Sequence, residues 1–207
     1  MSSIRFARKT DTRGYNKRFV LAVEGRATER QYFKMINDMF TKTTGKVAKP
    51  IPHYKAHKTS ALQILKQMQR YIRKNPLKDG DQAWLVLDKD DNKDADLDTL
   101  YHWTQEGKNG QRGLALSNPC FEYWLLLHFD AGNAASTKDD CNKCLKKYLP
   151  NYDKHISVYK FTRDRIKKAI EHAQKRDQPP CPDWPRQPGT TTVYRLVEAL
   201  LEPDNAC

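Results

Sequence analysis

The chain has 207 residues, and its 37 Lys and Arg against 25 Asp and Glu give a formal net charge of +12 at pH 7. This length corresponds to one domain, or to one domain with an elaboration. The basic excess favours a polyanionic partner, nucleic acid first. No apolar run approaches the ~20 residues of a membrane span, and the polar, basic start is not a secretory signal. The five cysteines have no disulfide-framework spacing, so we expect a cytoplasmic protein that does not enter a membrane.

After a basic, unpatterned arm over residues 1–17, apolar spacing predicts alternating strands and helices. In chain order we expect a strand over 19–23, a helix over 29–39, a loop over 41–48, a strand over 51–54, a helix that is capped at 59 or 60 and ended by Asn75-Pro76, a strand over 84–88, a helix over 96–106, a strand over 113–117, and helices over 118–129, 137–148, 162–176 and 190–201. This alternation predicts an α/β fold, a parallel sheet flanked by helices and joined by right-handed crossovers.

Local signals predict where two of the helices begin. Thr28 is of a residue type that is favoured at N-caps, and Asn118 followed by Pro119 is typical of an N-cap and first helical position. The helix after Pro119 is apolar nearly all round and should be buried, with Glu122 as the exception. Because a buried carboxylate needs a cation, Glu122 is either part of a structural salt bridge or a metal-binding or catalytic group.

The last third of the chain is expected to be mainly helical. We therefore divide the protein into a core over 18–130 and a helical C-terminal region over 131–207 that packs on it. Basic residues and tyrosines alternate in this region, a composition that suits contact with phosphates and stacked bases. For any single lysine, a solvated helix surface is an equally good interpretation. The candidate nucleic-acid contacts are Lys89, Lys154, Arg163 and Lys167.

Carboxylates follow two predicted strands at the point where each strand ends. Glu24 follows the 19–23 strand, and Asp88 and Asp90 follow the apolar run at 84–87. If these strands are adjacent and parallel, the three carboxylates meet at the carboxyl edge of the sheet, where open α/β sheets bind ligands. A divalent cation would remove their mutual repulsion, and oxygen ligands suit Mg²⁺ or Mn²⁺. The alternative is a solvated acidic loop.

The same residues resemble a known pattern, that of Toprim proteins, with one Glu after the first strand and a DxD after a later one. The arrangement is most similar to the RloB-like proteins, and the resemblance covers nearly the whole chain after residue 17. Its most specific part is residues 117–129. The matching segments are Val23-Glu24-Gly25, Thr28-Glu29, Tyr32-Phe33, Leu87-Asp88-Lys89-Asp90, residues 117–129, Tyr152-Asp153-Lys154 and residues 190–197.

The resemblance implies a Toprim-like, Rossmann-like sheet that holds Mg²⁺ for phosphodiester chemistry. It also implies a role in prokaryotic anti-phage defence or abortive infection, often beside an ABC-type or AAA-type ATPase; related effectors are nucleases, some acting on tRNA. We therefore expect a metal-dependent nuclease, with RNA such as tRNA slightly favoured over DNA. Asp88 and Asp90 would bind Mg²⁺ or Mn²⁺, Glu24 would join them or act as general acid or base, and Glu122 is the fourth candidate carboxylate.

Two other classes of function compete with this hypothesis. The first is a non-catalytic nucleic-acid-binding or regulatory subunit of an ATPase-containing defence complex. The second, a Toprim enzyme for primer synthesis or strand transfer, is disfavoured because 207 residues leave little room for the accessory domains. The sequence leaves open whether the protein forms a homodimer.

Overall fold

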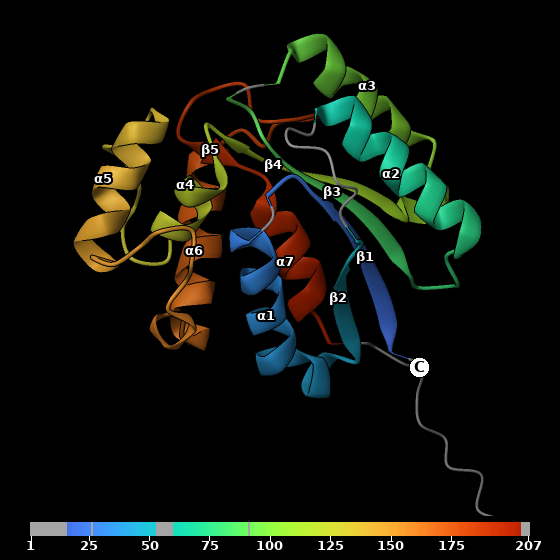
Figure 1. The fold of residues 1–207 in the computed structure, drawn as a ribbon, viewed down its shortest axis with the longest axis horizontal. Helices are drawn as coiled ribbons and strands as arrows, with labels where there is room; N and C mark the ends of the chain where they lie inside the picture. The colour runs from blue at the N-terminus through green and yellow to red at the C-terminus, as the bar shows by residue number, and fades with distance from the viewer. Residues whose placement is uncertain (1–15, 26, 53–59, 91, 204–207) are drawn as a thin grey trace, which may run out of the picture.

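The computed structural model describes residues 16–25, 27–52, 60–90 and 92–203. Within these residues, five strands form one sheet in the order β2-β1-β3-β4-β5, with helices on both of its faces (Figure 1). The strands are β1 (Lys17–Val23), β2 (Lys46–Pro50), β3 (Gln82–Asp88), β4 (Arg112–Asn118) and β5 (Thr190–Thr191). The first four strands are parallel, and β5 pairs antiparallel with β4. The predicted α/β fold is confirmed.

Seven α-helices and two short 3₁₀ turns surround the sheet in the described part of the chain. The helices are α1 (Thr28–Thr44), α2 (Ala61–Lys74), α3 (Asp94–Gln105), α4 (Phe121–Leu126), α5 (Lys138–Tyr148), α6 (Arg163–Arg176) and α7 (Val193–Leu201), and the turns are η1 (Lys108–Gly110) and η2 (Val158–Lys160). None of the helices found among these residues is long and apolar enough to cross a membrane.

Strand β1 is buried on both faces, as its continuous apolar run predicts. Alternate side chains of a strand point to opposite faces, so Val20 and Ala22 pack with α2 and α3. Phe19, Leu21 and Val23 pack in a second cluster with side chains from α1, α4, α5, α6 and α7. The C-terminal helices therefore share one hydrophobic cluster with the first strand and the first helix.

Strands β1 and β3 lie side by side and parallel, with Val23 opposite Val86. The adjacency required to bring the predicted carboxylates together is thus confirmed. Strand β4 lies beside β3, with Ser117 opposite Asp88. The ends of these three strands form the edge of the sheet on which the candidate site is built.

The predicted position of the second strand was wrong. Helix α1 continues to Thr44 and ends at Gly45, whose φ of 66° is the left-handed conformation that favours glycine at a helix end. Strand β2 then begins at once, so residues 41–48 are not a loop. Ile51 follows the strand, and the rest of the strand expected over 51–54 lies partly outside the described residues, as does the basic arm up to residue 15.

Two predicted helix starts were also wrong. Ala27, not Thr28, is the N-cap of α1, and the Thr28 side chain bonds elsewhere. Asn118 ends β4, where it pairs with Thr190, and its side-chain amide donates to main-chain oxygens of the Pro-rich connector. Helix α4 therefore begins at Phe121 and ends at Leu126, well short of residue 129, and β5 precedes α7 where helix was expected from residue 190.

Candidate functional site

A cavity of about 310 Å³ lies where β1 and β3 end. Five carboxylates and two ammonium groups line it together with parts of the β1–α1 turn and α4. The charged residues are Glu24, Glu29, Asp88, Asp90, Glu122, Lys138 and Lys154. All four carboxylates predicted from the sequence thus face one cavity.

Glu24 lies between the ends of the two strands. Its main-chain N–H donates to the Val86 oxygen at 3.0 Å, which continues the β1–β3 pairing. Its carboxylate Oε2 accepts from the Asp88 main-chain N–H at 3.2 Å. The first strand's carboxylate is therefore bonded directly to the start of the DxD segment.

Asp88 ties β3 to the segment that carries Glu122. Its Oδ1 accepts from the Phe121 main-chain N–H at 2.8 Å, at the start of α4. The main-chain N–H groups of Lys89 and Asp90 each lie 3.1 Å from the Pro119 oxygen. These bonds hold the DxD segment against the β4–α4 connection and fix how the carboxylates face each other.

Asn92 holds Glu24 and the Asp88 main chain in place from outside the cavity. It is 8% exposed, and its Nδ2 donates to Glu24 Oε2 at 3.2 Å and to the Asp88 main-chain oxygen at 2.8 Å. Its Oδ1 accepts from the Ala61 N–H at 3.1 Å, at the start of α2. Sequence analysis did not identify Asn92, although its place two residues after Asp90 was the available signal.

Glu122 is 3% exposed and forms the salt bridge that its burial requires. Its Oε1 pairs with the Lys154 ammonium and accepts from the Tyr152 hydroxyl at 2.9 Å. Thr28 in turn donates to the Lys154 main-chain oxygen at 3.0 Å. Lys154 has a φ of 59°, an uncommon conformation for a residue other than glycine. The backbone thus holds its ammonium at the cavity despite a local conformational cost.

Lys138, the first residue of α5, is the second ammonium group of the cavity. It lies 2.5 Å from Asp90 Oδ2, and this hydrogen bond raises the pKa of the lysine. Sequence analysis missed Lys138 because it is 48 residues from Asp90 in the chain. Only the packing of α5 beside α4 brings the two together.

Glu29 is the carboxylate that sequence analysis did not assign to the site. It lies in the first turn of α1 and is 6% exposed. A Cβ on Gly25 would lie 1.8 Å from its Oε2, so the glycine leaves the space that this carboxylate fills. The available signal was its position in the matching run from Glu24 to Phe33.

Burial and mutual repulsion change the pKa values of the clustered carboxylates. Burial, and then the charges of the surrounding carboxylates, raise the pKa of Asp88 well above its ordinary value. Burial also raises the pKa of Glu29 to about 7, with Glu122 and Glu24 adding to the shift. Burial acts on Glu122 as well, but the hydrogen bonds and charge from Lys154 and Tyr152 outweigh it, so the pKa of Glu122 falls below its ordinary value.

The donor set fits a hard divalent cation by its chemistry, because all candidate ligands are carboxylate oxygens. The side chains are not arranged as a preformed centre: among the described residues, no three His, Cys, Asp or Glu side chains are grouped to hold a metal ion. Lysines and main-chain amides bond to the oxygens instead. Binding of a cation would require Asp90 and Glu122 to exchange lysine contacts for metal contacts.

The other predicted contacts with nucleic acid lie outside this cavity. Lys89 donates to the Asn92 main-chain oxygen, pairs with Asp94 at 3.0 Å and lies 5.7 Å from the centre of the Trp184 ring. Arg163 binds the Met39 main-chain oxygen, eleven residues along α1 from Thr28, or about 16 Å at 1.5 Å per residue. Lys167 is exposed on α6. The structure does not bring Arg163 or Lys167 to the carboxylates.

A second, basic cavity of about 420 Å³ adjoins the carboxylates through Lys154, which lines both. Its other cations are Lys143 and Lys146 on α5, and Tyr152 forms part of its wall. Three lysines therefore line the way from the carboxylate cavity along α5, together with two carboxylates, Asp139 and Asp153. Lys143 and Lys146 belong to the basic region that the sequence predicted to suit contact with phosphates, although neither was among the four named candidates.

The fold and the cavity together define an α/β protein with a mostly parallel sheet and a cluster of carboxylates at its carboxyl edge. The family model described as "RloB-like protein" matches residues 19–200, which is most of the chain. The protein therefore belongs to the RloB-like family, as the sequence motifs predicted. No curated protein and no solved structure shows significant similarity to it.

Proposed function

We propose that this protein is a metal-dependent nuclease that hydrolyses phosphodiester bonds in nucleic acid and acts as an effector of prokaryotic anti-phage defence. The observation that carries the proposal is the convergence of five carboxylates and two lysines in one cavity of a chain with a net charge of +12. Carboxylates suit a cation and lysines suit a phosphate, so the cavity has groups for both partners. RNA such as tRNA is the substrate we favour.

Glu24, Asp88 and Asp90 would hold Mg²⁺ or Mn²⁺, because they leave adjacent strand ends and face the same space. Such a cation supplies charge neutralisation and activation of water for attack on phosphorus. Glu29 and Glu122 complete the negative wall of the cavity. Glu24 is also the candidate general acid or base, since it lines the same cavity.

The lysines would position the phosphate. Lys138 at the start of α5 and Lys154 in the segment after Tyr152 both line the cavity. An ammonium group binds phosphate oxygens as a compact charge. The adjoining basic cavity would bind the next phosphates of the strand through Lys143 and Lys146.

A second function has one observation in its favour. Lys138 and Lys154 already pair with Asp90 and Glu122. In this arrangement the lysine ammonium groups, rather than a metal ion, neutralise the two carboxylates. A non-catalytic subunit that binds nucleic acid and docks on an ABC-type or AAA-type ATPase would have this property. Such a protein would bind RNA equally well with Mg²⁺ or with EDTA, and would cleave none of it.

The test is a cleavage assay on bulk tRNA, single-stranded DNA and plasmid DNA with Mg²⁺, Mn²⁺ or EDTA. The parent protein is compared with Glu24→Gln and Asp88→Asn, which remove charge with little change in volume. Asp79→Asn is the matched control, because Asp79 is an exposed carboxylate in the turn before β3, outside the cavity.

If the protein is a nuclease, the parent and Asp79→Asn should give metal-dependent cleavage products. The cleavage rate of Glu24→Gln and of Asp88→Asn should be at least about 100-fold lower. The substrate that is cut identifies the nucleic acid. Equal cleavage by the parent and Asp88→Asn would contradict the proposal. RNA binding without cleavage, unaffected by EDTA, would favour the non-catalytic subunit.

A further inference from the structure

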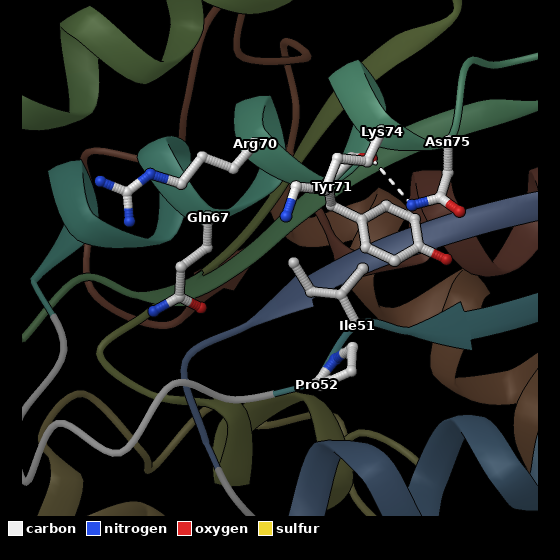
Figure 2. Close-up of a pocket in the computed structure, with 7 residues that line it drawn as sticks. All are labelled: Ile51, Pro52, Gln67, Arg70, Tyr71, Lys74 and Asn75. Atoms are coloured by element: carbon white, nitrogen blue, oxygen red, sulfur yellow. Dashed lines mark hydrogen bonds between the residues drawn. The ribbon is translucent and has the colours of Figure 1, made fainter.

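A separate cavity of about 300 Å³ lies between α2 and the chain that leaves β2, away from the carboxylates (Figure 2). None of its lining residues lines the carboxylate cavity. Helix geometry explains why several side chains of α2 line this cavity, since residues three and four apart share one face of a helix. Gln67, Arg70, Tyr71 and Lys74 have this spacing and all line the cavity.

The floor of the cavity is apolar and fixed. Ile51 is 4% exposed, and its main-chain N–H donates to the Leu21 oxygen at 2.8 Å. Its main-chain oxygen accepts from Arg30 of α1. Figure 2 shows the Tyr71 ring extending from α2 over Ile51. The ring packs on the cluster that includes Ile51, and its solvent-facing side is suited to stacking with a flat ring.

Gln67 provides the second indication of a ligand. Its side chain is directed toward Ile51 and Pro52 in Figure 2, and the residue is only 9% exposed. Its amide forms no hydrogen bond with any residue that the structure describes. The amide atoms are not among the fully buried unbonded atoms of the described residues, so they face the open cavity, and a ligand that displaces solvent there must supply a donor and an acceptor. A ligand edge with an adjacent donor and acceptor, as on a nucleobase, would satisfy both groups.

The rim of the cavity is cationic. Arg70 and Lys74 are exposed, and neither forms an ion pair with a residue in the described ranges. Two such cations one helical turn apart, next to an apolar slot, are suited to a phosphate attached to the flat ring. The cavity therefore offers a stacking surface, a base-pairing edge and a phosphate contact in one place.

We infer that this cavity binds a nucleotide, with the base against the Tyr71 ring and the Gln67 amide, and the phosphate at Arg70 and Lys74. The nucleotide is either a free molecule or one unit of a nucleic acid strand, since both present the same chemistry. This inference does not depend on the proposed nuclease activity, because it involves none of the carboxylates.

The test measures binding by calorimetry in EDTA, with the full chain and two kinds of probe. One set contains the four 5′-nucleoside monophosphates and adenosine, and the other is a short single-stranded RNA of mixed sequence. Tyr71→Leu removes the ring, Gln67→Leu removes the amide, and Arg70→Ala with Lys74→Ala removes the phosphate contact. Lys66→Ala with Arg73→Ala is the control, because it removes the same charge from exposed positions of α2 outside the cavity.

The parent is expected to bind at least one monophosphate, with Tyr71→Leu and Gln67→Leu each weakening it at least about fivefold. The Arg70 and Lys74 double variant should weaken monophosphates but not adenosine, and the control should change neither. If only the RNA binds and the same variants weaken it, the ligand is a unit of a strand. If no probe binds, or if the cavity variants match the control while thermal unfolding shows them folded, the inference is wrong.

Discussion

Replacing Lys154 with Met tests how strongly Glu122 depends on its cation. The change removes the ammonium but leaves the Thr28 bond to the main-chain oxygen of residue 154 and a non-glycine residue at the same φ. Removing one partner from a fully buried ion pair costs about 3–5 kcal/mol, and an exposed pair contributes about 0.2–1. Glu122 is 3% exposed but the Lys154 side chain is 57% exposed. We therefore expect a loss of about 1–3 kcal/mol in the free energy of unfolding.

The assay is urea unfolding at pH 7 in EDTA, for Lys154→Met alone and together with Glu122→Gln. Because Gln carries no charge, Lys154→Met should cost much less in the Glu122→Gln background. Lys143→Met is the control, an exposed lysine on α5 that should change stability by less than about 0.5 kcal/mol. The argument is refuted if Lys154→Met costs no more than Lys143→Met, or if its full cost persists in the double variant, where a neutral amide replaces the carboxylate.

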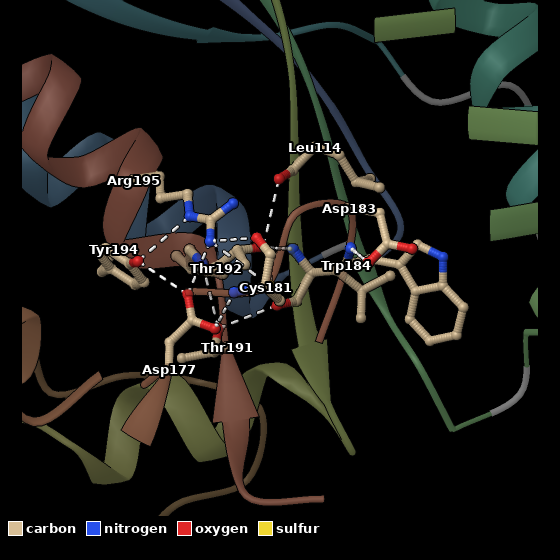
Figure 3. Close-up of polar contacts among 11 residues, drawn as sticks. Leu114, Asp177, Cys181, Asp183, Trp184, Thr191, Thr192, Tyr194 and Arg195 are labelled. Atoms are coloured by element: carbon tan, nitrogen blue, oxygen red, sulfur yellow. Dashed lines mark hydrogen bonds and ion pairs between the residues drawn. The ribbon is translucent and has the colours of Figure 1, made fainter. Parts of the chain in front are cut away.

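Three further predictions follow from the charged and buried groups. Burial raises the pKa of Glu29 to about 7, and a cation must displace that proton, so Mn²⁺ affinity should rise with pH up to about 7 and should rise less in Glu29→Gln. Burial lowers the pKa of His128 to about 3 from 6.5, so the unfolded chain binds the extra proton between these values. Urea unfolding should show up to about 1.4 kcal/mol less stability from this group per pH unit of acidification below 6.5, absent in His128→Gln. Asp177, 4% exposed, accepts from Arg195 at 2.8 Å (Figure 3), so Asp177→Ala should cost about 2–4 kcal/mol in urea unfolding.

For each of these predictions, one result would contradict the reasoning. Mn²⁺ affinity that is independent of pH between 6 and 8 would show that no proton is displaced on binding. A His128→Gln variant with the parent's pH dependence would show that His128 is not the group responsible. An Asp177→Ala variant as stable as the parent would show that the Arg195 contact contributes nothing, whereas a variant that lost Mn²⁺ binding would link this distant network to the carboxylates.

Much of the fold could be predicted because its central strands have strong local patterns. The apolar runs that became β1 and β3 must be buried on both faces, which places them side by side in the middle of the sheet. The sequence Lys46–Pro50 of β2 has no such pattern, because β2 is an edge strand with a single residue, Ala48, that is fully buried. Its position is determined by pairing with β1, a contact that a local pattern does not show.

The residues of the candidate site were also only partly predictable from the sequence. Glu24, Asp88 and Asp90 could be predicted because each follows a recognisable strand. Lys138 could not, because its contact with Asp90 depends on how α5 packs, whereas Asn92 was missed although it follows Asp90 by two residues. Asn118 shows the limit of local rules: a strong helix-start signal was overridden by its pairing with β5.

The most direct test of the central claim is Mn²⁺ binding followed by electron paramagnetic resonance, in the parent, Asp88→Asn and the control Asp79→Asn. The measurement needs no knowledge of the substrate. The account predicts saturable Mn²⁺ binding in the parent and in Asp79→Asn, competed by Mg²⁺ and weakened at least about tenfold in Asp88→Asn. Equal binding by the parent and Asp88→Asn, or no saturable binding by the parent, would contradict the claim that this cavity is a metal centre.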